Sequence, residues 1–84
     1  MKLFLISQNQ NNEFNTYDSA VVAAPDEETA KWMNPINGKP IDDWGLGKKY
    51  YHWCNGPEYV TVRYLGEAVG DVEQGVVCAS YIGG

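Results

Sequence analysis

The sequence contains few basic residues and no long apolar segment. Six Lys and Arg residues stand against eleven Asp and Glu residues, which gives a formal net charge of −5 over 84 residues. Binding to long DNA or RNA depends on clustered Lys and Arg that neutralise phosphates, so this composition argues against a protein of that class. No apolar run approaches the roughly 20 residues of a membrane span, and residues 3–6 are too few for a signal-peptide core. We therefore expect an intracellular protein that binds neither membranes nor long nucleic acid.

Cysteine is also scarce, because Cys54 and Cys78 are the only two and neither belongs to a CxxC pair. Cys78 lies in an apolar, strand-like run and Cys54 in a polar and aromatic segment. Without a secretion signal, we expect both thiols to be reduced. A single disulfide between them is the alternative, and its geometry cannot be judged from sequence.

Residues able to support catalysis or metal binding are few. His52 is the only histidine, and its spacing of two from Cys54 places both side chains on one face of an extended segment. Zinc needs three or four ligands, and no third group that would orient a catalytic histidine can be named. We therefore expect no metal, no cofactor and no enzymatic activity. The alternative is a small nucleotide hydrolase or lyase that uses His52.

The chain is long enough for one domain, residues 1–84, with a small core. Pro25 and three following carboxylates are typical of a helix start, and the helix should run to about Asn34 before Pro35 stops it. A metal or partner site is the alternative explanation of the acidic triplet. Apolar or alternating runs predict four strands, at residues 2–7, 17–24, 58–67 and 76–82. The order ββαββ favours an α+β fold, with a small antiparallel sheet of about four strands and one helix packed on it.

The first strand is apolar on both faces. Leu3 and Leu5 point to one side and Phe4 and Ile6 to the other, which predicts that both faces of the sheet are covered. The following residues 8–15 are polar and are expected to form a loop without any part in the core.

Residues 35–57 differ in composition from the rest of the chain. They hold four glycines, three prolines, two tryptophans, two tyrosines and three of the six basic residues. A connection of this length in so small a domain is usually functional or disordered, and the aromatic residues argue against disorder. The turn dipeptides Asn37-Gly38 and Asn55-Gly56 predict a short hairpin or a compact loop. We interpret 35–57 as a long functional loop.

Within this loop, the run 44–51 (WGLGKKYY) combines backbone N–H groups, positive charge and aromatic rings. Such a combination suits a phosphorylated small molecule that carries a ring. Asp42 and Lys49 occupy positions where a Walker-type phosphate loop needs Gly and Ser or Thr, so that motif is excluded. The alternative is a solvated turn whose tyrosines pack the loop down. The predicted ligand-binding residues are Trp44, Gly45, Gly47, Lys48, Lys49, Tyr50, Tyr51, Trp53 and Arg63.

Arg63 joins this set because a guanidinium binds oxyanions through two parallel hydrogen bonds, although a solvated or ion-paired strand position is the alternative. The eleven Trp, Tyr and Phe residues exceed the needs of a core of this size. The surplus predicts an interface or a ligand pocket, and the alternative is that the long loop uses its rings as a small core of its own. Small size and surplus aromatic surface also favour a homo-oligomer, with the pocket near a subunit boundary.

Three segments carry a resemblance to known sequences. They are YDSAVVAA at residues 17–24, Trp53 followed by VTVRYLGEA at 60–68, and GVVCASY at 75–81. Together they resemble a family of short phage and bacterial proteins of unassigned function, and residues 37–52 are longer than this family leads one to expect. The resemblance implies a phage or prophage protein that acts in the host cytoplasm without catalysis.

The leading hypothesis is therefore a counter-defence protein that sequesters a small nucleotide-like signalling ligand. The alternative is an acidic inhibitor that binds a host defence protein or nuclease complex, whose basic surface would attract a chain of charge −5.

Overall fold

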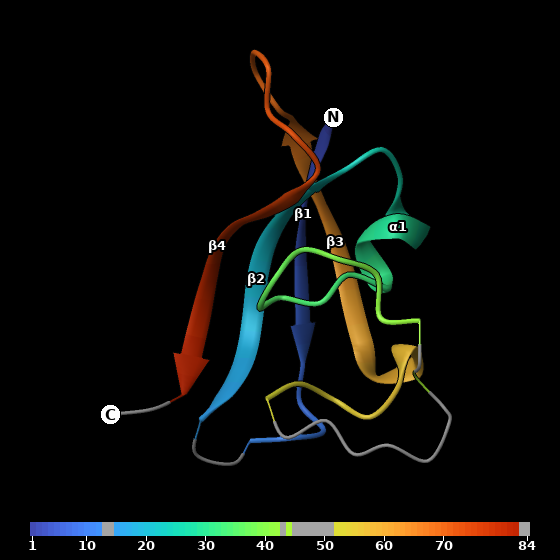
Figure 1. Cartoon of the computed structure of the whole chain (residues 1–84), viewed down its shortest axis with the longest axis vertical. Coiled ribbons are helices and arrows are strands. Elements are labelled where there is room, and N and C mark those ends of the chain that lie inside the picture. The colour runs from blue at the N-terminus through green and yellow to red at the C-terminus, as the bar shows by residue number, and fades with distance from the viewer. Residues whose placement is uncertain (13–14, 43, 45–51, 83–84) are drawn as a thin grey trace.

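The computed structural model describes residues 1–12, 15–42, 44 and 52–82. It contains a four-stranded antiparallel sheet and one short helix, which confirms the expected α+β class (Figure 1). The strands lie in the order β3-β1-β2-β4, so the chain's last two strands form opposite edges of the sheet. The elements are β1 (Lys2–Gln8), β2 (Thr16–Ala24), α1 (Glu27–Lys31), the 3-10 turn η1 (Pro57–Tyr59), β3 (Val60–Glu67) and β4 (Gly75–Ile82).

Helix α1 is shorter than the sequence predicts. It begins where expected, since the Asp26 side chain caps it by accepting a hydrogen bond from the Thr29 backbone N–H at 2.7 Å. It ends at Lys31, after which Met33 forms an antiparallel bridge with Pro40. The predicted end near Asn34 is therefore wrong, because the last residues of the expected helix belong to a short hairpin closed by this bridge.

This turn, residues 33–40, is a compact hairpin. The Asn34 N–H donates to the Lys39 carbonyl at 2.8 Å, and the Ile41 N–H donates to the Trp32 carbonyl at 2.8 Å. The dipeptide Asn37-Gly38 lies within it, in the segment where the sequence predicts a short hairpin or a compact loop. Gly38 has a φ of 73°, and a Cβ atom there would lie 3.0 Å from the Gly75 Cα at the start of β4.

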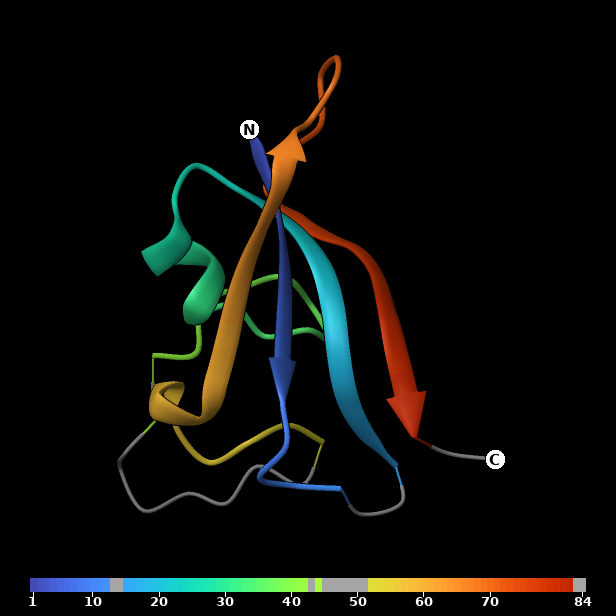
Figure 2. The same ribbon diagram turned by 180° about the vertical axis from the view of Figure 1, so that it is seen from behind.

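The core lies on one face of the sheet, beneath α1 and the 33–40 hairpin (Figure 1). Phe4 and Ile6 point into it, whereas Leu3 and Leu5 on the other face are only half-buried. Seen from behind, no described element covers that second face (Figure 2). Within the described part of the chain, the expectation that both faces are covered is therefore not met, because a helix of five residues and one loop cover only one face. The core comprises Phe4, Ile6, Ala20, Val22, Ala24, Ala30, Met33, Ile41, Trp44, Trp53, Cys54 and Val60.

The polar connection after β1 is partly buried, contrary to the expectation of a loop outside the core. Gln8 is 6% exposed and Asn11 is 8% exposed. The Gln8 side chain accepts from the Asn11 N–H at 2.8 Å, and it donates to the Asn11 carbonyl at 2.7 Å and to the Tyr17 carbonyl at 2.9 Å. One glutamine side chain therefore closes the connection between β1 and β2.

The closed connection holds the far end of the long loop. The Asn11 side-chain amide donates to the Trp53 carbonyl at 3.0 Å, and the Gln10 side chain accepts from the Asn55 N–H at 3.0 Å. The Tyr17 N–H donates to the His52 carbonyl at 2.9 Å. We call these three contacts the polar clamp, because they fix residues 52–55 against the end of the sheet.

The close approach of Gly38 to β4 predicts a cost for any side chain there. Gly38→Ala should lower the free energy of unfolding by about 2–4 kcal/mol, since left-handed backbone strain adds to a contact with the β4 backbone. Gly70→Ala is the matched control: Gly70 has a φ of 79° and nothing within 4 Å of its added Cβ. The control should lose only about 1 kcal/mol. Equal losses in urea denaturation would contradict the close approach.

Candidate functional site

Six of the nine predicted ligand-binding residues lie outside the described residues. The three that the structure places are Trp44, Trp53 and Arg63. The structure therefore places only these three members of the predicted set. The six others are Gly45, Gly47, Lys48, Lys49, Tyr50 and Tyr51.

Both described tryptophans of the loop belong to the core. Trp44 is 7% exposed and Trp53 is 1% exposed. The Trp44 ring meets the Trp32 ring edge-to-face at 5.6 Å, and its Nε1–H donates to the Cys54 carbonyl at 3.0 Å. Both indoles therefore pack with Phe4, Ile6 and the other core residues on the sheet, and not in a separate small core of the loop. Their part in ligand binding stays a prediction.

Arg63 lies on the other face of the sheet. It pairs with Leu5 in the β1–β3 register and is exposed, whereas Trp44 and Trp53 pack on the side of Phe4 and Ile6. The sheet separates the guanidinium from both indoles. The structure therefore does not bring the three described members of the predicted site together.

His52 and Cys54 are also separated. His52 is exposed, with its Nδ1 2.7 Å from the Asn15 carbonyl oxygen, while the buried Cys54 thiol donates to the Gly56 carbonyl at 3.4 Å. The expected placement of both side chains on one face is thus wrong. Burial raises the pKa of Cys54 to about 11, so this thiol is neutral at physiological pH and is a poor nucleophile. Both cysteines are unpaired, as expected.

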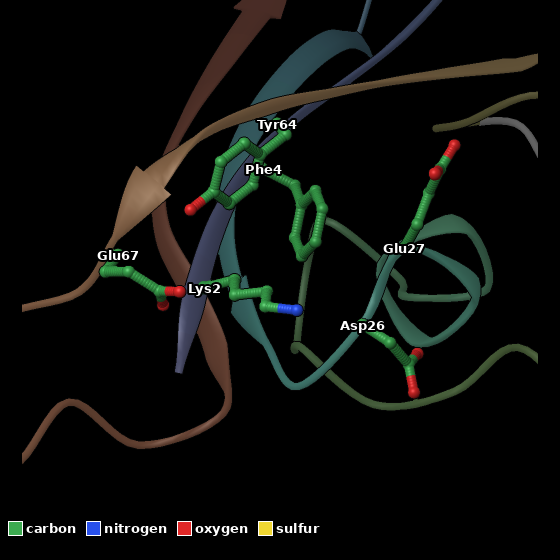
Figure 3. Close-up of a pocket in the computed structure, with 6 residues that line it drawn as sticks. All are labelled: Lys2, Phe4, Asp26, Glu27, Tyr64 and Glu67. Carbon is green, nitrogen blue, oxygen red and sulfur yellow. The ribbon is translucent and has the colours of Figure 1, made fainter.

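A different group of side chains lines one pocket. An open pocket of about 470 Å³ lies between the start of β1, the end of β3 and the start of α1 (Figure 3). Lys2 and Glu67 stand opposite each other in the β1–β3 register. The Lys2 side chain extends between Glu67 and Asp26. The pocket is lined by Lys2, Phe4, Asp26, Glu27, Tyr64 and Glu67.

The aromatic wall of this pocket is a pair of rings from neighbouring strands. Phe4 and Tyr64 are register partners, and their rings meet edge-to-face with centroids 5.8 Å apart. Phe4 is 3% exposed and belongs to the core, whereas Tyr64 is 54% exposed. The buried ring therefore supports an exposed one, which leaves part of the tyrosine ring accessible to a binding partner.

The pocket is predominantly acidic. It brings together three carboxylates and one ammonium group. Hydrogen bonds from the Thr29 side chain and backbone lower the pKa of Asp26, and the charge of Lys2 acts in the same direction. Asp26 is therefore ionised throughout the physiological range. Carboxylates beside an exposed aromatic ring can hold an ammonium or guanidinium group through charge-assisted hydrogen bonds and a cation–π contact.

This pocket was not predicted from the sequence. Asp26, Glu27 and Glu28 were expected to form a helix start, which the structure supports, and Lys2 and Glu67 had no predicted role. The missing information is the pairing of β1 with β3, which are separated by more than fifty residues. Local patterns carry no signal for such a pairing.

Comparison with known proteins finds no similar family, curated protein or solved structure. The resemblance to short phage proteins therefore stays a prediction from the sequence. Within the described part of the chain, no helix has the length and apolar character needed to cross a bilayer. Those same residues contain no group of three His, Cys, Asp or Glu side chains that could hold a metal ion.

The different burial of the two thiols predicts selective reactivity. In the native protein, a thiol reagent should modify Cys78 rapidly, and Cys54 only after denaturation. Mass spectrometry of the digested product would identify the modified residue. Rapid modification of Cys54 in the folded protein would contradict its buried, neutral state.

The same burial predicts a pH dependence. The Cys54 pKa is raised from 9.0 to about 11 on folding, so over this range the unfolded chain loses a proton that the native state keeps. Stability should therefore fall as the pH rises from about 9 to about 11. Cys54→Ser removes this group and should make the fall shallower in urea denaturation.

Proposed function

We propose that this chain is a non-catalytic binding protein of phage or prophage origin that acts in the host cytoplasm. Its target is a basic surface of a host defence protein or nuclease complex, which it inhibits by occupying that surface. The sequence resemblance supports the setting. The acidic pocket on β1, β3 and α1 supports the mode of binding, and it is the observation on which the proposal rests.

The geometry of the pocket favours a protein partner. Asp26, Glu27 and Glu67 are all exposed, so the pocket is shallow and accessible to a side chain that projects from a larger surface. Lysine and arginine side chains are long enough to reach such a pocket while their backbones stay outside it. An arginine could bind a carboxylate through two hydrogen bonds and stack on Tyr64 in the same pose.

The overall charge supports the same assignment. A net charge of −5 on a chain of 84 residues attracts basic surfaces over distances longer than a contact. Such steering raises the rate of association, while the pocket supplies specific contacts that determine dissociation. Electrostatic steering and the pocket contacts can be separated experimentally, because steering depends on the total charge alone and the pocket contacts do not.

Removal of two pocket carboxylates should therefore weaken binding more than the same change of charge elsewhere. Glu27→Gln with Glu67→Gln should raise the dissociation constant for an arginine-rich peptide by about tenfold or more, since charge-assisted hydrogen bonds are lost. Isothermal titration calorimetry measures this constant. Amide chemical shifts of residues 2, 64 and 67 should move during the titration of the native chain.

The matched control is Asp71→Asn with Glu73→Gln. These two residues are exposed in the connection between β3 and β4, and their removal changes the net charge by the same amount. The control should retain most of the affinity. Equal weakening by both pairs would show that total charge alone attracts the peptide, and the pocket would then have no special role.

Nucleotide capture is the second candidate. The composition of the run 44–51 supports it, since lysines, glycines and aromatic residues suit a phosphorylated ligand that carries a ring. Trp44 and Trp53 are both buried in the core. The binding residues would then be Lys48, Lys49 and the adjacent tyrosines.

Native mass spectrometry of the chain purified from cells tests this candidate. Loss on denaturation of a passenger with the ultraviolet spectrum of a nucleotide would support capture. Lys48→Ala with Lys49→Ala should then abolish the passenger, because the phosphate partners are removed. The same variant should leave peptide binding at the acidic pocket intact. A chain without passenger that gains none from a mixture of cyclic and ADP-ribose-type nucleotides would contradict capture.

A further inference from the structure

The two edges of the sheet differ in how they are protected. Both β3 and β4 pair with one neighbour only, so each has an outer row of backbone N–H and C=O groups that no strand of the described chain pairs. Exposed edges invite pairing with another chain, and natural sheets usually protect them with charged residues, proline or a covering element.

Strand β3 has such protection. It carries Arg63 and Glu67, and it follows directly after Pro57 and Glu58 in η1. Helix α1 also packs against it. Charges on an edge strand oppose its pairing with an identical strand, because like charges meet across the pair.

Strand β4 has less protection, and the 33–40 hairpin approaches it at its first two residues, Gly75 and Val76. Its eight residues, Gly75–Ile82, contain no charged residue and no proline. Residues 77–80 are exposed, and Val77 is 55% exposed although it is a large apolar residue. In a chain with a net charge of −5, this uncharged strand is the edge where a second copy meets the least electrostatic repulsion.

We infer that β4 is the interface of a homodimer, in which two copies of the strand pair antiparallel across a two-fold axis. An eight-residue antiparallel pair can form about eight main-chain hydrogen bonds, which is close to the number in a typical stable interface. The two sheets then join into one sheet of eight strands, with the protected β3 edges outermost. Because one strand binds its own copy, the assembly closes at two subunits and does not form fibres.

Two-fold symmetry restricts the register enough to design a test. Antiparallel pairing about a perpendicular two-fold axis places one residue directly opposite its own copy. Cys78 and Ser80 are exposed on the same sheet face, opposite Val21 and Ser19 of β2. With residue 79 on the axis, Cys78 lies opposite Ser80 of the other copy. With residue 78 or 80 on the axis, that residue lies opposite its own copy.

The test compares sedimentation of the native chain and a lysine variant. The native chain should sediment as a dimer, and Cys78→Lys with Ser80→Lys should raise the dimer dissociation constant by about tenfold or more through like-charge contact. Cys78→Glu with Ser80→Glu should do the same. An equimolar mixture of the two variants should recover a heterodimer in native mass spectrometry, which also shows that both variants fold.

The matched control places the same charges on the other edge. Thr61→Lys with Leu65→Lys changes two exposed positions of β3 and should leave the dimer intact. A native chain that stays monomeric at all concentrations would overturn the inference. So would a dimer that the β4 lysines do not weaken, or one that the β3 lysines weaken equally.

Discussion

The polar clamp, which joins Gln10, Asn11 and Tyr17 to residues 52–55, is the set of contacts on which the rest of the structure depends. Helix α1 has five residues and cannot cover the sheet by itself, so the core needs Trp53, Cys54 and Trp44 from the loop. The Asn11 side-chain amide donates to the Trp53 carbonyl, and the Asn55 backbone N–H donates to the Gln10 side chain, so these bonds fix the segment that carries Trp53 and Cys54. Trp44 is joined to the same segment through its hydrogen bond to the Cys54 carbonyl. Each contact joins segments about forty residues apart, so the approach that makes these polar bonds also brings Trp53 and Cys54 into the core.

The dependence of the core on contacts between distant segments explains which parts of the fold the sequence could predict. The strands follow from local alternation, and the register confirms that Val62 and Tyr64 share the face of Ile6 and Phe4. The role of the loop tryptophans could not be predicted in the same way. An aromatic residue in a glycine-rich segment suits a ligand and a core equally, and only the pairing of distant segments decides between them.

The candidate pocket was unpredictable for a related reason. Its carboxylates come from α1 and from the end of β3, and its aromatic wall comes from Phe4 and Tyr64, which meet only because β3 pairs with β1. The acidic residues at the helix start have a sufficient structural explanation as helix caps. That they also line one pocket with Lys2 and Glu67 depends on the pairing of β3 with β1, which no local spacing reveals.

The strand order also relates the two proposed surfaces to each other. The acidic pocket lies on β1 and β3, while β4 lies at the opposite edge of the sheet, with β2 between β1 and β4. Pairing through β4 would therefore leave the pockets of both copies free and place them towards opposite ends of one continuous sheet. A partner that repeats its basic surface would then be bound at two points, and its apparent affinity would exceed that of one pocket through effective concentration alone. Dimerisation would strengthen binding without adding a single contact to the site.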